Sequence, residues 1–295
     1  MSLTSLLLIL LSAAIHVGWN LMTKSSSSPK VFSALKGFPF MVMGILTVSI
    51  LGLEAIPPGV LRIALVSGVI HAVYMYALST AYEDGDLSLV YPIVRSSPAF
   101  VPLAAWLFLG ETISFQGFLG IAIVVACILV LQLRSADSIG FNALWTNRDN
   151  LWAFLALAMV VSYSLVDKEA MVRFRDADAL VPNLRGPVFF ILLASISSLI
   201  LNLLLVATGT RGFGTVLTRE WKRILIASLG MMLSYSLILN VMQSEKVSYI
   251  VTLRQSSILM ATILGWLVLK ERHGRYRFTI SIIMIVGFAL VILAD

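Results

Sequence analysis

The chain has 295 residues, of which 59% are hydrophobic and 12% charged, and its mean hydropathy is +0.96. A soluble domain carries about a quarter charged residues, so this much apolar surface cannot be buried in one aqueous core and must face lipid. The net charge of +6 is spread over many short loops, as in membrane-flanking segments, and does not form a nucleic-acid-binding stripe. The single cysteine, Cys127, excludes a disulfide framework and a cysteine-based metal site.

Ten apolar stretches are long enough to cross a hydrocarbon core of about 30 Å, which takes roughly 17–25 residues. In chain order they cover residues 3–22, 31–53, 59–80, 87–109, 115–133, 151–168, 183–207, 223–243, 247–269 and 278–294. No Lys or Arg precedes Lys24, so the first stretch lacks the positive start of a signal peptide and is interpreted as a mature helix. The sequence therefore predicts an all-α integral membrane protein of ten transmembrane helices.

The two halves of the chain resemble each other. Shifting the fourth stretch by 160 residues onto the ninth places Ser88, Ser96, Ser97, Trp106 and Glu111 on Ser248, Ser256, Ser257, Trp266 and Glu271. Five helices per half is an odd number, so the copies must have opposite orientations in the membrane, an arrangement typical of alternating-access transporters. We predict a first repeat at residues 1–133, a connecting loop at 134–150 and an inverted second repeat at 151–295, packed around a central cavity.

Two sets of motifs resemble a known family. The tryptophan-containing helices that end in Leu109-Gly110-Glu111 and Leu269-Lys270-Glu271 are similar to the EamA modules of the drug/metabolite transporter superfamily. The segment His16-Val17-Gly18-Trp19-Asn20 resembles a subgroup whose first helix carries His-x-x-Trp-Asn. The resemblance implies ten helices around a central cavity, secondary transport of metabolites and a location in the bacterial inner membrane. Where that subgroup often has an acid after the arginine of the ninth helix, this chain has Gln255.

Arg95 lies near the middle of the fourth stretch, where an ionisable residue is costly and normally faces a cavity or a partner. Pro92, Pro98 and Pro102 interrupt the backbone hydrogen bonding around it, and Tyr91 is on the same helix face. These features predict a cavity-lining helix. The alternative is that Arg95 holds helices together by pairing with a carboxylate or a carbonyl.

Arg254 lies inside the ninth stretch, one position out of register with Arg95 across the repeat. The acids close to the spans all fall at predicted span ends: Glu54, Asp86, Glu111, Asp167, Glu245 and Glu271. Because guanidinium groups bind carboxylate and phosphate in a fork-like pair, two embedded arginines without an embedded acid favour a bound anion. We predict an anionic or zwitterionic substrate with a carboxylate, phosphate or phosphonate group, bound near the first, fourth and ninth helices.

The first helix carries a polar stripe that includes His16 and Asn20, with Trp19 beside them. His16 is eight residues before Lys24, where the related small multidrug pumps carry an embedded acid. Because histidine titrates near neutral pH, His16 is a candidate for a coupling proton; packing or substrate contact is the alternative. The predicted substrate-contacting residues are Arg95, Arg254, Tyr91, Trp19, Asn20, Gln255 and Tyr163.

Other functions fit the sequence less well. An intramembrane enzyme needs paired acids or a histidine cluster inside the spans, whereas His16 and His71 are isolated, and His71 is interpreted as a helix–helix contact. We predict no catalytic residue, no cofactor and no metal. The expected partners are a small-molecule substrate and the lipid bilayer, without nucleic acid, and a homodimer is left open. A broad-specificity exporter of amphiphiles or amino acids is the alternative, and it would depend on aromatic residues rather than on arginines.

Two arguments on orientation disagree. With a cytoplasmic N-terminus, six Lys and Arg residues would flank the spans on the cytoplasmic side and thirteen on the other. Since positive charge collects on the cytoplasmic side, this distribution favours external termini. The family resemblance implies cytoplasmic termini.

Overall fold

The computed structural model describes residues 1–84, 93–133, 148–260 and 274–294, and all regular structure in these ranges is helical. The helices of the first half are α1 Leu3–Lys24, α2 Pro29–Leu51, the 3₁₀ turn η1 Leu53–Ala55, α3 Pro58–Asp84, α5 Ser97–Leu109 and α6 Phe115–Leu133. Those of the second half are α8 Arg148–Asp176, α9 Pro182–Ala207, α10 Phe213–Met242, α11 Val247–Leu253 and α13 Gly274–Ile292.

Six of these helices are long and apolar enough to cross a membrane: α1, α2, α3, α8, α9 and α10. Three further apolar helices, α5, α6 and α13, are shorter within the described residues. The predicted span at 115–133 coincides with α6, whereas the span predicted at 223–243 begins ten residues later than α10 does. The span predicted at 151–168 ends eight residues before the end of α8. In both cases the helix is longer than the apolar span, because charged residues can extend a helix beyond the apolar layer without breaking it.

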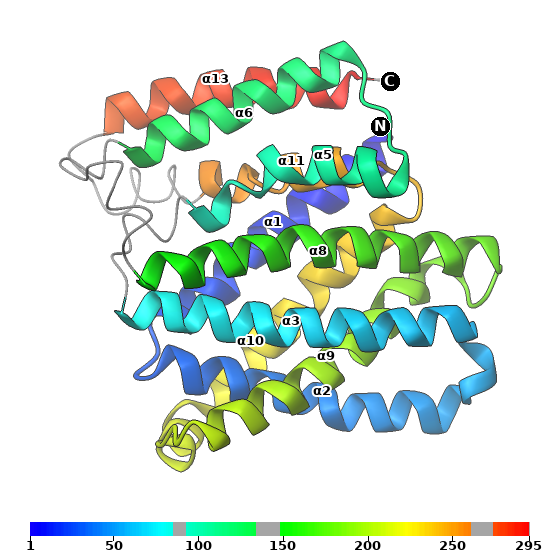
Figure 1. The fold of residues 1–295 in the computed structure, drawn as a ribbon, viewed down its shortest axis with the longest axis vertical. Coiled ribbons are helices and arrows are strands. Elements are labelled where there is room, and N and C mark those ends of the chain that lie inside the picture. The colour runs from blue at the N-terminus through cyan, green and yellow to red at the C-terminus, as the bar shows by residue number, and fades with distance from the viewer. Residues whose placement is uncertain (85–92, 134–147, 261–273, 295) are drawn as a thin grey trace.

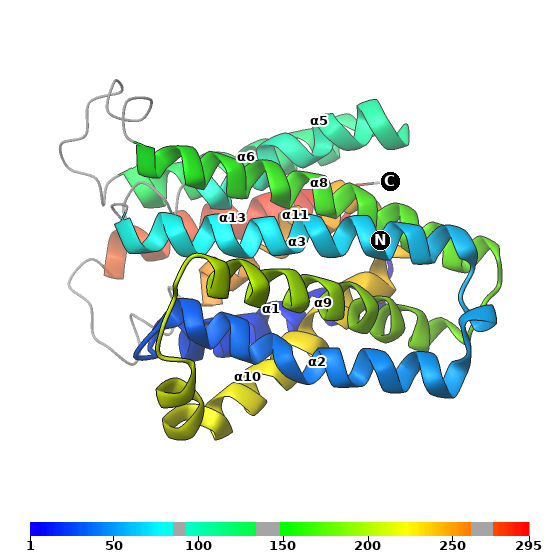
Figure 2. The ribbon, with the colours of Figure 1, turned by 60° about the horizontal axis from the view of Figure 1, so that its bottom comes forward.

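The bundle is built from pairs of helices that lie side by side. Figure 1 shows α6 and α13 along one edge and α2 and α9 at the opposite edge, with α3 next to α8 between them. The first helix packs against α10, and α5 packs against α8 and α11. Figure 2, turned by 60°, shows α8 still lying along α3. Most close helix pairs therefore join one half of the chain to the other.

Both ends of the chain lie on the same side of the bundle (Figure 1). The backbone N–H of Ser2, which caps α1, donates to Oε1 of Glu245 at 3.0 Å, just after α10. At the opposite end of α1, Glu220 accepts hydrogen bonds from Ser26 and Ser27, at 2.7–3.0 Å. The α1–α10 pair is thus held together by polar contacts at both of its ends.

Candidate functional site

The fourth and ninth predicted helices are both interrupted at their arginines. Residues 93–95 are helical, Ser96 forms a turn, and α5 begins at Ser97. In the second half, α11 ends before Arg254, the turn covers Arg254 and Gln255, and residues 256–260 are again helical. Backbone bonds there run from residue i to i−3, as from Ser257 N–H to the carbonyl of Arg254 at 3.2 Å. Broken membrane helices are tolerated where they are buried in protein or line a cavity.

Arg254, at this turn, lies beside the first helix and α10. Its Nη2 lies 3.4 Å from Nδ1 of His16, and its guanidinium carbon lies 5.2 Å from the ring centre of Tyr235. The amide of Asn20 lies 2.6 Å from the other ring nitrogen of His16. Because arginine can only donate, Nδ1 of His16 acts as an acceptor in this contact. Arg254 is partly accessible although it sits inside the bundle.

Arg95 also belongs to this region. Its Nη1 donates to Oγ of Ser257 at 3.4 Å, which connects the fourth helix to the residues just after the break in the ninth. Arg95, Arg254 and Lys36 all lie close enough to His16 to interact with it electrostatically. Three cations from separate helices therefore converge on the polar stripe of α1.

Lys36 of α2 approaches the same stripe from the opposite direction. Its side chain is 2% exposed, its Nζ lies 4.3 Å from the ring centre of Trp19, and it donates to Oγ1 of Thr23 at 3.5 Å. Trp19 is in turn in edge contact with His16, with ring centres 4.8 Å apart. An ammonium over an indole face is favourable, more so where water is excluded.

Aromatic rings connect the arginine region to α3. Tyr163 of α8 stacks on His71 with ring centres 4.2 Å apart, and Tyr74 lies at 5.5 Å from Tyr163. Tyr235 lies 6.3 Å from Tyr163 and carries Arg254 on its face. The three tyrosines thus form a wall between α3, α8 and α10 beside Arg254.

Asp167 lies on the other side of these tyrosines from Arg254. The prediction that this acid falls at a span end is wrong. The carboxylate is 0% exposed and lies within α8, nine residues before the helix ends at Asp176. It accepts hydrogen bonds from the hydroxyl of Ser67 and, at 2.6 Å, from that of Tyr235. His71 lies 3.9 Å from it. The chain therefore does contain an embedded acid, with a histidine next to it.

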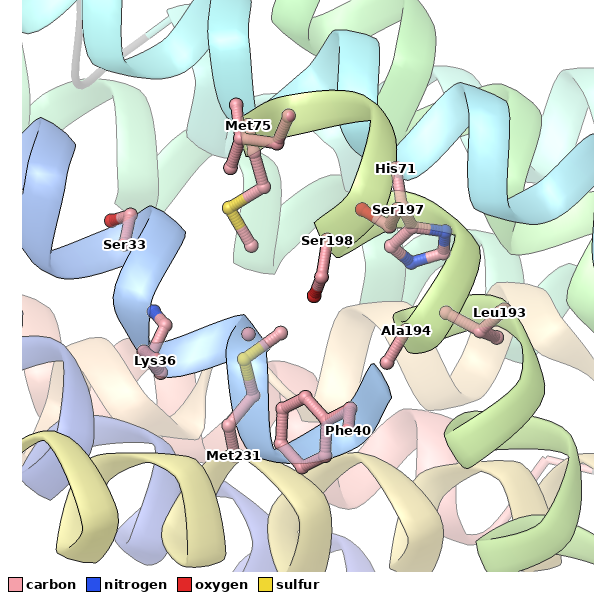
Figure 3. A pocket seen from close by; sticks show the side chains of 12 residues that line it. Ser33, Lys36, Phe40, His71, Met75, Leu193, Ala194, Ser197, Ser198 and Met231 are labelled. Carbon is pink, nitrogen blue, oxygen red and sulfur yellow. The ribbon is translucent and has the colours of Figure 1, made fainter. Parts of the chain in front are cut away.

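A small cavity of about 20 Å³ lies between α2, α3, α9 and α10. Lys36 and His71 line it, and Figure 3 shows Met75, Met231 and the hydroxyl of Ser198 pointing into it. A space of this size holds about one water molecule. It connects the surroundings of Lys36 to those of His71 inside the bundle.

Comparison with known proteins agrees with this architecture. Residues 3–133 match the EamA-like transporter family. No curated protein matches the sequence. The fold matches 28 chains of solved structures; a crystal structure of a protein at 15% sequence identity superposes with a TM-score of 0.74, covering 99% of this chain and 98% of the other. The EamA match and the six long apolar helices indicate an integral membrane protein that crosses the bilayer several times.

The structure brings together some of the predicted residues. Arg254, His16, Asn20 and Trp19 are neighbours, and Arg95 reaches the same region through Ser257. Tyr163 lies one layer away, next to Tyr235. Gln255 is 5% exposed and its amide donates to the Val251 carbonyl at 3.4 Å. Tyr91 lies outside the described residues.

Lys36, Asp167 and Tyr235 belong to the site but are not among the predicted contact residues. Lys36 is the one charge in the apolar run of α2, which was a usable signal. The charges that follow Asp167 in the sequence indicate a span end, yet buried Ala170, Met171 and Phe174 continue the helical pattern beyond it. Tyr235 carries no signal in an apolar helix, because its importance depends on what meets it from α8 and α11.

Proposed function

We propose that this protein is a secondary transporter of a small anionic or zwitterionic metabolite, whose carboxylate, phosphate or phosphonate group binds at Arg254. The observation that carries the proposal is the position of Arg254, which lies at a tightened turn of the ninth helix with its guanidinium beside His16 and Tyr235. Irregular turns within membrane helices are found where the chain is buried in protein or lines a cavity. Arg95, Trp19, Asn20, Gln255 and Tyr163 are the proposed neighbours of the substrate, together with Tyr91.

The charges around Arg254 support an anion as cargo. Within the part of the chain that the structure describes, neither Arg254 nor Lys36 makes an ion pair with a carboxylate. Asp167 takes its hydrogen bonds from Ser67 and Tyr235 instead. An embedded cation is stabilised by an opposite charge, and a guanidinium matches the two oxygens of a carboxylate or phosphate.

Polar atoms without partners support a polar ligand at the same place. Nε1 of Trp19 and Oε1 of Gln255 have no hydrogen-bond partner among the described residues, although both side chains are at least nine-tenths buried. Buried polar groups are nearly always hydrogen-bonded, so such groups are where a ligand or ordered water is expected. A zwitterion would satisfy a donor and an acceptor together.

We also propose that the protein has ten membrane helices in two inverted repeats, residues 1–133 and 151–295, joined by 134–150. In such a repeat, α1, α2 and α3 of the first half correspond to α8, α9 and α10 of the second. The helix contacts follow this symmetry: α1 packs against α10 as α8 packs against α3, and α2 packs against α10 as α9 packs against α3. The pairs α2–α9, α5–α11 and α6–α13 are each converted into themselves. Rocking of one repeat against the other is then the transport movement, in a bacterial inner membrane, with protons as the proposed driving ion.

The proposal is tested on the purified full-length protein with acetate, inorganic phosphate, methylphosphonate, glycine and choline as probes. We expect an anion to raise the melting temperature of the wild type, and to do so much less in Arg254→Ala. Arg219→Ala removes an exposed arginine of α10 and is the matched control, which should keep the full shift. Uptake of the stabilising anion into proteoliposomes should follow the same order. Equal stabilisation of wild type and Arg254→Ala by every anion contradicts the proposal.

A second candidate function is export of amphiphilic metabolites. It is favoured by the aromatic wall of Tyr74, Tyr163 and Tyr235 and by the neighbouring Trp19. This function predicts stabilisation by organic cations and neutral aromatics as well as by anions, with no dependence on Arg254. The thermal-shift comparison of Arg254→Ala with Trp19→Ala therefore separates the two candidates.

A further inference from the structure

A buried polar cluster joins α3, α8 and α10 beside the arginine site. It consists of Asp167, His71, Ser67 and Tyr235, each less than a tenth exposed. Two hydroxyl donors reach the Asp167 carboxylate, one from Ser67 and one from Tyr235. Tyr163 stacks on His71 and closes the cluster on the side of α8. An ionisable group inside a membrane bundle is expected to have a function, since its burial is costly.

The hydrogen bonds of His71 define which of its nitrogens faces Asp167. Nδ1 lies 2.9 Å from the backbone carbonyl of Ser67, and a carbonyl only accepts, so Nδ1 carries a hydrogen. In a neutral imidazole the other nitrogen, Nε2, is then an acceptor. Nε2 lies 3.9 Å from Oδ2 of Asp167, which is also an acceptor when ionised. Two buried acceptors therefore face each other 3.9 Å apart, and either of them can bind a proton.

We propose that Asp167 and His71 share one exchangeable proton, and that this proton is taken up from solvent when an anion binds at Arg254. The second part rests on the proposed function of the arginine site. The proton converts either the carboxylate to a carboxylic acid or the imidazole to an imidazolium, and in both cases the pair gains one positive charge. The small cavity at His71 provides space for a water molecule next to the pair.

Tyr235 is the physical connection between the two sites. Its ring lies under the guanidinium of Arg254, and its hydroxyl donates to Asp167 at 2.6 Å. The titratable and charged groups close enough to Asp167 to interact with it electrostatically are His71 from α3, Tyr163 from α8, Tyr235 from α10 and Arg254 at the turn after α11. Without substrate, Arg254 stabilises the negative charge of Asp167 at a distance, across Tyr235, although the two groups form no ion pair. When a bound anion neutralises Arg254, a negative Asp167 beside it becomes unfavourable, so the anion and the proton bind together.

His16 is less suited to this role. Its Nδ1 accepts from Arg254 and is therefore engaged when the site is empty. A proton on that nitrogen would place a fourth cation among Arg254, Arg95 and Lys36. The Asp167–His71 pair, by contrast, has an unoccupied proton position and one compensating charge nearby.

The shared proton is tested without any substrate by infrared difference spectroscopy of the full-length protein in lipid, between acidic and neutral pH. We expect a carboxylic-acid C=O band that is lost in Asp167→Asn and shifted in frequency in Ser67→Ala and Tyr235→Phe, which each remove one donor. Glu220→Gln, which changes a buried acid outside the cluster, is the control and should keep the band. If Asp167→Asn does not fold, the frequency of the C=O band in Ser67→Ala and Tyr235→Phe still shows whether Asp167 takes up the proton. Identical difference spectra for all of these proteins overturn the proposal.

Coupling is tested by adding acetate, which is fully ionised at neutral pH, to weakly buffered protein with a pH-sensitive dye. The wild type should take up protons, and its acetate affinity should rise on acidification by roughly 5–150-fold, the usual range of coupling between two sites. Asp167→Asn should bind acetate, as judged by thermal shift, without proton uptake. Acetate binding with unchanged proton uptake in Asp167→Asn overturns the inference and leaves the proposed function intact. Absence of any stabilising anion contradicts the proposed function, whereas the infrared result still decides the shared proton.

Discussion

Lys36 places an ammonium group inside the second membrane helix, where it contacts the face of Trp19 and donates a long hydrogen bond to Thr23. Three ammonium hydrogens need acceptors, and Thr23 is the acceptor found among the described residues, so the residue lowers the stability of the empty protein. Such a residue is retained where function requires it, because functional sites commonly reduce stability. Lys36 lies between the α1 stripe and the cavity at His71, which is where a second contact to an anion would be useful.

Replacing Lys36 with methionine should therefore stabilise the protein and weaken anion binding. Methionine has nearly the same length and carries no charge, so the desolvation penalty disappears while the packing is kept. We expect the melting temperature of the ligand-free protein to rise by about 2–4 °C, which corresponds to roughly 1 kcal/mol. The stabilisation by anions should decrease in the same variant. Differential scanning fluorimetry measures both.

Lys222→Met is the control for this experiment, because Lys222 is exposed and near the start of α10. It should leave both the melting temperature and the anion effect unchanged. A lower melting temperature for Lys36→Met would mean that the ammonium is structurally satisfied, and would contradict a functional reason for its burial.

At the scale of elements, the short helices depend on contacts between the two halves. Glu111 follows α5 and binds the start of α11: Oε1 accepts from the backbone of Val247 at 2.8 Å, and Oε2 accepts from the hydroxyl of Ser248 at 2.8 Å. A carboxylate at the N-terminus of a helix compensates unpaired amides and the helix dipole. Because α11 leads directly to the break at Arg254, this contact also positions the arginine.

Glu111→Ala should destabilise the protein by about 1–2 kcal/mol, the usual effect of removing a helix N-cap. Transport should fall as well, since the orientation of α11 determines where Arg254 lies. The melting temperature and the uptake rate of the stabilising anion are the measurements. Glu54→Ala, which removes an exposed acid after α2, should change neither. Equal behaviour of the two variants would contradict the positioning role of Glu111.

The α6–α13 pair depends on glycine. A Cβ added to Gly120 would lie 2.7 Å from the carbonyl oxygen of Gly287 and 2.9 Å from the backbone nitrogen of Val291. Backbone atoms cannot move aside as a flexible side chain can, and close approach through small residues is how membrane helices associate. Gly120→Ala should therefore separate α13 from α6.

We expect Gly120→Ala to lower stability by about 1–3 kcal/mol, as overpacking does. Gly214→Ala is the control, and its effect on stability should have the opposite sign. A Cβ at Gly214 meets nothing within 4 Å, and Gly214 lies in the first turn of α10. Alanine is a better helix former than glycine, so this variant should be stabilised by up to about 1 kcal/mol. Thermal unfolding of the two variants side by side is the measurement, and a stable Gly120→Ala would contradict the packing argument.

The helices could largely be predicted from the sequence, because long apolar runs bounded by polar residues need no tertiary information. The runs at 115–133 and 183–207 agree with α6 and α9 within one residue. The break at Arg254 could not be predicted in this way, since apolar residues continue on both sides of it. Nor could the roles of Asp167 and Tyr235, which depend on contacts between α8, α10 and α3. Single charges in apolar runs are the signal in the sequence that points to the site, and Lys36 carries it as much as the two arginines do.

At the scale of the whole molecule, the fold separates the connecting segments onto two faces. The chain starts on the face where Ser2 meets Glu245, and the loop after α8 lies on that same face, because Arg175 donates to the Gln243 carbonyl just after α10 at 2.7 Å. The opposite face carries the segment after α1, where Ser26 binds Glu220, and the loop between α9 and α10. A membrane must therefore expose the α8–α9 loop and the α9–α10 loop on different sides.

Labelling of single cysteines in intact cells tests this arrangement and also decides the orientation. Ala177 and Arg211 are exposed residues of the two loops, and Cys127 is buried in α6, so Ala177→Cys and Arg211→Cys are made in a Cys127→Ala background. A membrane-impermeant maleimide should label one variant in intact cells and both after lysis. The face of Arg211 also carries Arg219, Lys222 and Arg223, so the positive-inside rule predicts labelling of Ala177→Cys from outside. Labelling of Arg211→Cys instead would place the termini in the cytoplasm, as the family resemblance implies. Labelling of both variants in intact cells would contradict the two-faced fold itself.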